Sequence, residues 1–152
     1  MSILKINKQY YQILFGVILL SAILICALFA PLVATHDPAD YDVPNRLSPP
    51  SKEHLFGTDQ YGRDVFSRVV YGARLTLFIG IGVVALCGVA GISFGLLAGY
   101  FKRAELIIMR IMDGLMAFPA ILLALVIVAA MGPGMKNVII ALAISYTPRV
   151  AR

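Results

Sequence analysis

The feature that most constrains the fold of this chain is the stretch from Leu75 to Tyr100, which contains no charged residue. A helix needs about 20 mostly apolar residues to cross the hydrocarbon core of a bilayer, so this stretch is long enough to span one. The composition agrees: hydrophobic residues make up 60% of the 152-residue chain and charged residues 14%, with a mean hydropathy of +0.87. Soluble domains usually contain about half apolar and about a quarter charged residues. The sequence therefore predicts a membrane protein.

Three further apolar runs predict the rest of the fold. The first covers residues 13–34, and the next covers residues 107–131, where Phe118-Pro119 should bend the helix near its beginning because proline cannot donate the backbone hydrogen bond. The last run, at residues 138–152, offers only about 18 Å of helix before Arg149, at about 1.5 Å per residue, which is less than a bilayer core. We predict an all-α, polytopic helical membrane protein with three complete spans and a fourth that the C-terminus cuts off.

Residues 35–74 form the one long polar segment of the sequence. Four prolines break any long helix in its first part: Pro38, Pro44, Pro49 and Pro50. The residues from Thr58 to Arg68 have the pattern of a short amphipathic helix, with Thr58 as its N-terminal cap. Its charged residues form two acid–base pairs at i,i+4 spacing: Asp59 with Arg63, and Asp64 with Arg68. We predict that this helix lies at the outer interface and leads into the span at 75–100.

The distribution of Lys and Arg predicts the orientation. With residues 1–12 in the cytoplasm, the inner basic residues lie in very short segments, as the positive-inside rule requires. Most of the outer basic residues are spread through the long 35–74 segment, where charge has less influence on orientation. The N-terminus is therefore predicted to be cytoplasmic and residues 35–74 extracytoplasmic. The net charge of +5 fits this arrangement, and no basic stripe with interleaved aromatic residues indicates a nucleic-acid partner.

Few polar side chains in the sequence point to chemistry. Arg110 and Asp113 lie three residues apart near the cytoplasmic edge of a predicted span, and we interpret them as a structural pair. One group of residues with metal-binding side chains lacks the spacing of a helical ligand motif, and no metal site is predicted there: His36, Asp37, Asp40 and His54. The sequence shows no nucleophile–base set and no phosphate-cradling glycine loop, so no enzyme activity and no cofactor are predicted.

Small residues recur every four positions in the second span, at Gly91, Gly95 and Gly99. In a membrane helix this spacing forms a flat stripe that another helix can approach closely. We therefore predict a helix-packing face at these three glycines.

Several stretches together resemble one family, the inner-membrane permease subunits of binding-protein-dependent ABC importers for oligopeptides, dipeptides and nickel. The most specific part is a motif expected on the outer side, with the residues Gly57, Thr58, Asp59, Gly62, Arg63, Asp64, Arg68 and Arg74. Four stretches support it: Gly99-Tyr100-Phe101, Met109 to Asp113, Ala117-Phe118-Pro119 and Tyr146 to Arg152. The resemblance covers nearly the whole chain after about residue 35.

The resemblance implies a multi-pass subunit of the bacterial cytoplasmic membrane that forms a translocation pathway with a sister permease. Two cytoplasmic ATPase subunits would drive it, and the permease itself would not hydrolyse ATP. An extracytoplasmic substrate-binding protein would deliver the substrate, which the sequence leaves open between dipeptides, oligopeptides, nickel and a metal chelate. The motif from Gly57 to Arg74 would lie near the docking surface of that binding protein.

The resemblance also implies that family members continue beyond Arg152 through a cytoplasmic helix that docks into the ATPase. Pro148, Arg149 and Arg152 would then mark the start of a coupling region, and we expect this chain to be truncated there and unable to transport alone. Two other hypotheses stay open. A small four-span secondary transporter would depend on Asp113 as its membrane carboxylate. A non-transporting fragment would only assemble with a permease, through the glycine stripe.

Overall fold

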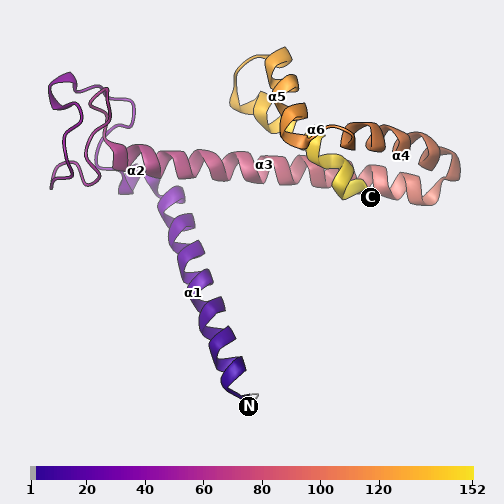
Figure 1. The fold of residues 1–152 in the computed structure, drawn as a ribbon, viewed down its shortest axis with the longest axis horizontal. Coiled ribbons are helices and arrows are strands. Elements are labelled where there is room, and N and C mark those ends of the chain that lie inside the picture. Colours follow the sequence, from indigo (N-terminus) through magenta and orange to yellow (C-terminus); the bar gives the residue numbers. More distant parts are fainter. Residues whose placement is uncertain (1–2) are drawn as a thin grey trace. The chain divides into compact units, whose positions relative to one another are not determined.

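A computed structural model describes the backbone of residues 3–152 and the side chains from Tyr10 onward. The regular elements among these residues are helical, apart from one isolated antiparallel bridge between Thr58 and Asp64. In chain order they are α1 (Ile3–Leu28), α2 (Ala30–Val33), the 3-10 turn η1 (Val43–Asn45), α3 (Val65–Tyr100), α4 (Lys102–Met116), α5 (Ala120–Met131) and α6 (Met135–Ala151) (Figure 1). The predicted all-α fold is confirmed.

Two of the helices are long and apolar enough to cross a membrane by themselves: α1, over Tyr10–Leu28, and α3. The helices α4 and α5 are long and apolar enough to cross a membrane only when they are taken together. The described residues therefore contain two spans, or three if that pair counts as one. The described helices thus support two or three spans, and the predicted number of three complete spans with a partial fourth stays a prediction. From Tyr10 onward, nearly all of the apolar side chains of α1 are exposed, as expected of a helix surrounded by lipid or by a partner.

The predicted span at residues 107–131 is not one gently bent helix. It consists of α4, which begins earlier, at Lys102, and α5, and the two helices are bent by 92° at the break between them. Pro119 lies in this break, where the sequence predicts a bend. Because proline lacks the backbone N–H and disfavours a helical conformation in the residue before it, α4 ends before Pro119 and a new helix begins at Ala120.

Helix α3 corrects a second prediction. The sequence predicts a separate amphipathic helix from Thr58 to Arg68, but residues 58–64 form a closed turn, and α3 begins at Val65 and continues without a break to Tyr100. Its 36 residues extend about 54 Å at about 1.5 Å per residue, which exceeds the roughly 30 Å of a bilayer core. The polar first turns of α3 are therefore an extension of the apolar helix, and Thr58 does not cap it.

The chain divides into two compact units, one ending at Leu77 and the other beginning at Phe78. In the second unit α6 is central, because it packs against both α4 and α5 and crosses the C-terminal half of α3 (Figure 1). Its buried residues are almost all small: Ala141, Ala143, Ser145, Thr147, Pro148 and Ala151. The buried hydroxyls of Ser145 and Thr147 donate to carbonyls one turn earlier in α6, so close packing leaves neither unsatisfied.

Candidate functional site

Two glycines shape the loop that precedes α3. Gly57 has φ +71° and Gly62 has φ +80°, a left-handed conformation that other residues adopt only with strain. Space is also lacking: a Cβ at Gly57 would overlap the carbonyl oxygen of Ser48, and one at Gly62 would overlap that of Asp42. Both positions therefore need glycine, and through them the loop folds back against its own earlier residues.

Thr58 fastens this loop to the segment before it. Its backbone N–H donates to the carbonyl of Ser48 over 3.1 Å, and its hydroxyl oxygen accepts from the backbone N–H of Ser48 over 2.9 Å. The same hydroxyl donates to the carbonyl of Asn45. Thr58 is buried, so these bonds are shielded from water. The sequence assigns Thr58 to a helix cap, but its role in the structure is to hold two loop segments together.

Asp59 is the centre of the turn that leads to α3. Its carboxylate accepts hydrogen bonds from the backbone N–H groups of Tyr61 (2.8 Å) and Arg63 (3.1 Å) and from the Arg63 guanidinium (2.9 Å). Arg68 also pairs with it. Burial raises the pKa of Asp59, but the two backbone N–H groups and Arg63 outweigh burial and lower the pKa to about 2. Asp59 is thus an ionised anchor for two arginines.

Only one of the two predicted acid–base pairs forms as predicted. Asp59 pairs with Arg63 at i,i+4. Asp64 does not pair with Arg68, because the loop turns between residues 58 and 64 and brings Arg68 to Asp59 instead. The Arg63 guanidinium also lies over the ring of Tyr61, 4.7 Å from its centroid. Charge and cation–π contacts therefore concentrate on the Asp59 side of the turn.

Asp64 is the N-terminal cap of α3. One carboxylate oxygen accepts the backbone N–H of Ser67 over 2.7 Å, three residues into the helix, and the other lies 3.0 Å from Nδ1 of His54. Burial raises the pKa of Asp64, but the Ser67 N–H and hydroxyl and the nearby His54 and His36 outweigh it and lower the pKa. The side chain is only 1% exposed, so a carboxylate is held almost out of water at the helix start.

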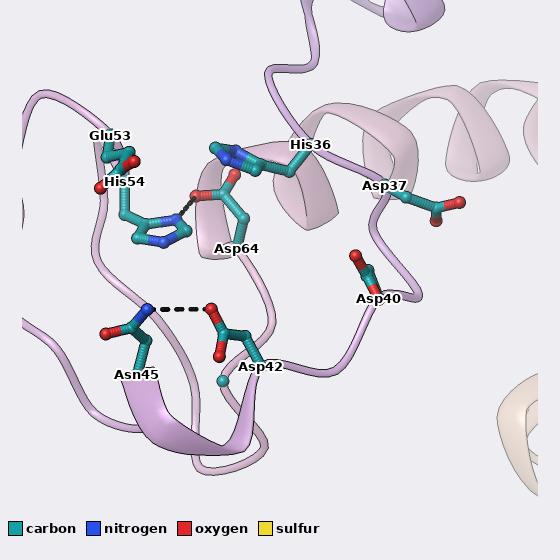
Figure 2. Close-up of a pocket in the computed structure, with 9 residues that line it drawn as sticks. His36, Asp37, Asp40, Asp42, Asn45, Glu53, His54 and Asp64 are labelled. Carbon is teal, nitrogen blue, oxygen red and sulfur yellow. Dashed lines mark hydrogen bonds and ion pairs between the residues drawn. The ribbon is translucent and has the colours of Figure 1, made fainter.

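A cleft of about 140 Å³ opens beside this carboxylate (Figure 2). His36 and His54 meet Asp64 there, and their rings are tilted by 32° with centroids 4.8 Å apart. Further acidic residues line the same cleft: Asp37, Asp40, Asp42 and Glu53. The sequence groups His36 with His54 without predicting a metal site, and it links neither histidine to Asp64, which is predicted to pair with Arg68 instead. The one local signal that could have identified Asp64 is its residue type, because aspartate is favoured at the position just before a helix, and α3 begins at Val65.

The predicted glycine stripe lies in the second unit, against α6. A Cβ at Gly91 would come within 2.7 Å of Val150 Cγ1, and a Cβ at Gly95 would come within 2.8 Å of the carbonyl oxygen of Ala151. Gly99 has open space around it. Two of the three glycines thus face a helix of the same chain. Arg74, the last residue of the predicted outer motif, lies on α3.

The predicted pairing of Arg110 with Asp113 is wrong. Asp113 instead accepts from the Arg152 guanidinium over 2.7 Å, a pair that joins α4 to the end of α6. Both side chains are more than half exposed, so the pair contributes at most about 1 kcal/mol. The cause is the packing of α6 on α4, which brings the C-terminal arginine to the acid.

The other two residues predicted at the start of a coupling region lie on α6. Pro148 is fully buried within the helix. The Arg149 guanidinium lies 5.5 Å from the ring centroid of Tyr146, and Arg149 lines a cleft beside the break between α4 and α5. These are the positions of the predicted residues, and their part in coupling stays a prediction.

Comparison with known proteins supports the resemblance that the sequence motifs indicate. Residues 13–50 match the family model described as the N-terminal TM domain of oligopeptide transport permease C. The chain is 46% identical over 138 residues to the dipeptide transport system permease DppC of Alkalihalophilus pseudofirmus, covering 90% of this chain and 45% of that protein. Over nine-tenths of its length the chain is therefore similar to permeases of peptide transport systems. The family resemblance of the sequence is thereby confirmed.

Two further permeases match over a similar extent. The di/tripeptide transport system permease DppC of Pseudomonas aeruginosa is 45% identical over 144 residues, 90% of this chain and 48% of its own. The glutathione transport system permease GsiD of Pectobacterium atrosepticum is 44% identical over 147 residues, 95% of this chain and 48% of its own. The chain spans about half the length of the curated relatives it matches.

Proposed function

We propose that this chain is part of the transmembrane pathway of an ABC importer for short peptides. The observation that carries the proposal is the 44–46% identity to permeases of peptide transport systems over 90% or more of the chain. The exposed apolar surface of α1 supports it, because such a surface is stable only against lipid or another helix. In this proposal the chain positions substrate and moves with its partners, and it catalyses no bond cleavage.

The partners follow from the type of transport system. We propose a sister permease that completes the pathway, two cytoplasmic ATPase subunits, and an extracytoplasmic substrate-binding protein. Conformational change in such a system requires ATP-dependent contacts that differ between the inward-facing and outward-facing states. The residues Pro148, Arg149 and Arg152 are our candidates for the start of the region through which the ATPases act.

The orientation is also a proposal. We place the N-terminus in the cytoplasm and the loop before α3 outside, where the binding protein would dock. The loop geometry supports a docking role, because the two left-handed glycines and the buried Thr58 give the loop a defined backbone conformation. A preorganised loop loses less conformational entropy when a partner binds. Asp59, Arg63 and Arg68 would then present a fixed charge pattern at the outer face.

Uptake in the native host tests the function. We expect deletion of the gene for this chain to abolish the uptake of a labelled di- or tripeptide, and a plasmid copy to restore uptake. If the deletion instead abolished the uptake of labelled nickel and left peptide uptake unchanged, the substrate would be nickel rather than a peptide. The proposal would be overturned if deletion left the uptake of peptide and of nickel unchanged in a host where deletion of the ATPase gene abolishes peptide uptake.

Affinity purification separates the proposal from its two alternatives. A tag on the full product of the gene that encodes these residues should recover a second permease and the ATPases from detergent-solubilised membranes. Recovery of a permease without ATPases would favour a non-transporting assembly fragment. Proton-coupled efflux that is lost in Asp113→Asn would favour a secondary transporter, although the pairing of Asp113 with Arg152 at the end of α6 gives that carboxylate a structural role already.

A further inference from the structure

The only two histidines of the chain meet at one buried carboxylate. His36 comes from the segment after α2, His54 from the following loop and Asp64 from the start of α3 (Figure 2). One ligand atom from each of the three side chains lies within 4.8 Å of the other two. Three segments distant in sequence thus converge through two imidazoles and one carboxylate, which is a donor set that metal ions use.

We propose that His36, His54 and Asp64 form a binding site for a divalent transition-metal ion of the zinc class. Ligand atoms around a tetrahedral ion, at about 2.0–2.1 Å from it, stand about 3.3 Å apart. His54 Nδ1 and Asp64 Oδ1 are already 3.0 Å apart, close to that spacing. His36 is exposed and closes the remaining distance by rotating its ring toward the pair. The ion replaces the hydrogen bond between His54 and Asp64, so neither group is left unpaired.

The surroundings of the site favour a cation and fix one of its ligands. Asp64 is held through its second carboxylate oxygen, which accepts the Ser67 backbone N–H, and the Ser67 hydroxyl in turn accepts the backbone N–H of His36. Such outer partners orient metal ligands. The acidic rim of the cleft attracts cations, and Asp40 is one of the carboxylates in it.

The donor set selects the kind of ion. Two imidazole nitrogens with one carboxylate suit zinc and its neighbours among the transition metals, whereas calcium and magnesium require six or more oxygen ligands. An ion at this position joins the loop to the first turn of α3 by bonds stronger than the present hydrogen bond. It therefore stabilises the fold of the loop before α3, as structural metal ions do.

Metal titration of the full chain in detergent, with any polyhistidine tag removed, tests the site. By isothermal titration calorimetry we expect one Zn²⁺ per chain and a loss of affinity of at least ten-fold in His36→Ala and in His54→Ala. With Co²⁺ as a probe we expect the intense visible absorption of a four-coordinate ion and no thiolate band, because the two cysteines lie on α1 and α3, outside the cluster. Wild-type affinity in both histidine variants, or no binding of either ion, would overturn the proposal.

A rim variant serves as the matched control. Asp40→Asn removes a charge from the same cleft without touching the three proposed ligands, and we expect it to change the affinity by less than about three-fold. An equal loss in Asp40→Asn and His36→Ala would instead indicate diffuse attraction by an acidic surface and would contradict a defined site. His36→Ala is the primary variant because the exposed side chain of His36 can be removed without opening the core, while Asp64 also caps α3.

Discussion

At the scale of single residues, Asp64 carries two structural roles at once. It caps α3 through Ser67 and holds His54 in the loop, and its side chain is almost fully buried. We predict that Asp64→Ala destabilises the start of α3 by about 1–3 kcal/mol, because the helix loses its cap and the buried N–H of Ser67 loses its acceptor. Hydrogen exchange at the amides of residues 65–68 measures this, and faster exchange there is the expected result.

The matched control for this prediction is Asp64→Asn. Asparagine keeps an oxygen that accepts the Ser67 N–H but removes the negative charge beside His54. We therefore expect the amides of residues 65–68 to exchange faster than in the wild type and more slowly than in Asp64→Ala. If Asp64→Ala exchanged no faster than the wild type, Asp64 would not be the cap that the structure indicates.

Asp59 gives the loop a dependence on pH. Its pKa in the folded protein is about 2, below the value of about 3.9 for an unfolded aspartate. The ionised form is therefore the one that stabilises the fold: this stabilisation is complete above about pH 4 and is lost as the pH falls through about 2. We predict that the melting temperature falls on acidification from pH 5 to pH 2.5 and that Asp59→Asn reduces this fall. An equal fall in both proteins would assign the acid sensitivity to other groups.

At the scale of elements, the contact between α3 and α6 depends on the absence of a side chain at Gly95. A methyl group there would meet the carbonyl oxygen of Ala151 at 2.8 Å, and backbone cannot move aside as a flexible side chain can. We predict that Gly95→Ala destabilises the second unit by about 1–3 kcal/mol through overpacking. The thermal exposure of buried Cys87 to a thiol-reactive dye, in a Cys26→Ser background, reports it.

Gly99→Ala is the control, because it lies one helical turn from Gly95 in the same helix and has open space around it. There the gain in helix propensity acts alone, and we expect unchanged stability or an increase of up to about 1 kcal/mol. Equal destabilisation in both variants would show that α6 does not pack closely at Gly95.

The elements also show how far the sequence could lead. The apolar runs placed helices near their observed positions, because lipid-compatible helices need long uninterrupted apolar stretches. The break at Pro119 was predictable for a backbone reason, but its angle of 92° was not, since the packing of α6 against α4 and α5 involves residues distant in sequence. In the loop, the Asp59–Arg63 pair follows from local spacing. The meeting of His36 with His54 and Asp64 does not, because it depends on how the loop closes through Gly57 and Gly62.

At the scale of the whole molecule, the length of α3 and the position of its apolar part allow the membrane orientation to be tested. The helix is about 24 Å longer than a bilayer core, by the estimates of about 1.5 Å per residue and about 30 Å for the core. Its apolar part follows Arg74 and reaches Tyr100, while its first turns carry Arg68 and Arg74. The excess length therefore lies mainly at the N-terminal end of α3, which carries the loop with it into the aqueous phase.

We predict that this aqueous phase is the outer one. In a background without native cysteines, Lys52→Cys in the loop should react with a membrane-impermeant maleimide in intact cells or spheroplasts. Arg103→Cys, at the start of α4, should react only in inverted vesicles, because α3 crosses the bilayer between the two positions. Both side chains are exposed, so folding does not shield either thiol. The reverse labelling pattern would place the N-terminus outside, and it would remove the loop from any contact with an extracytoplasmic binding protein.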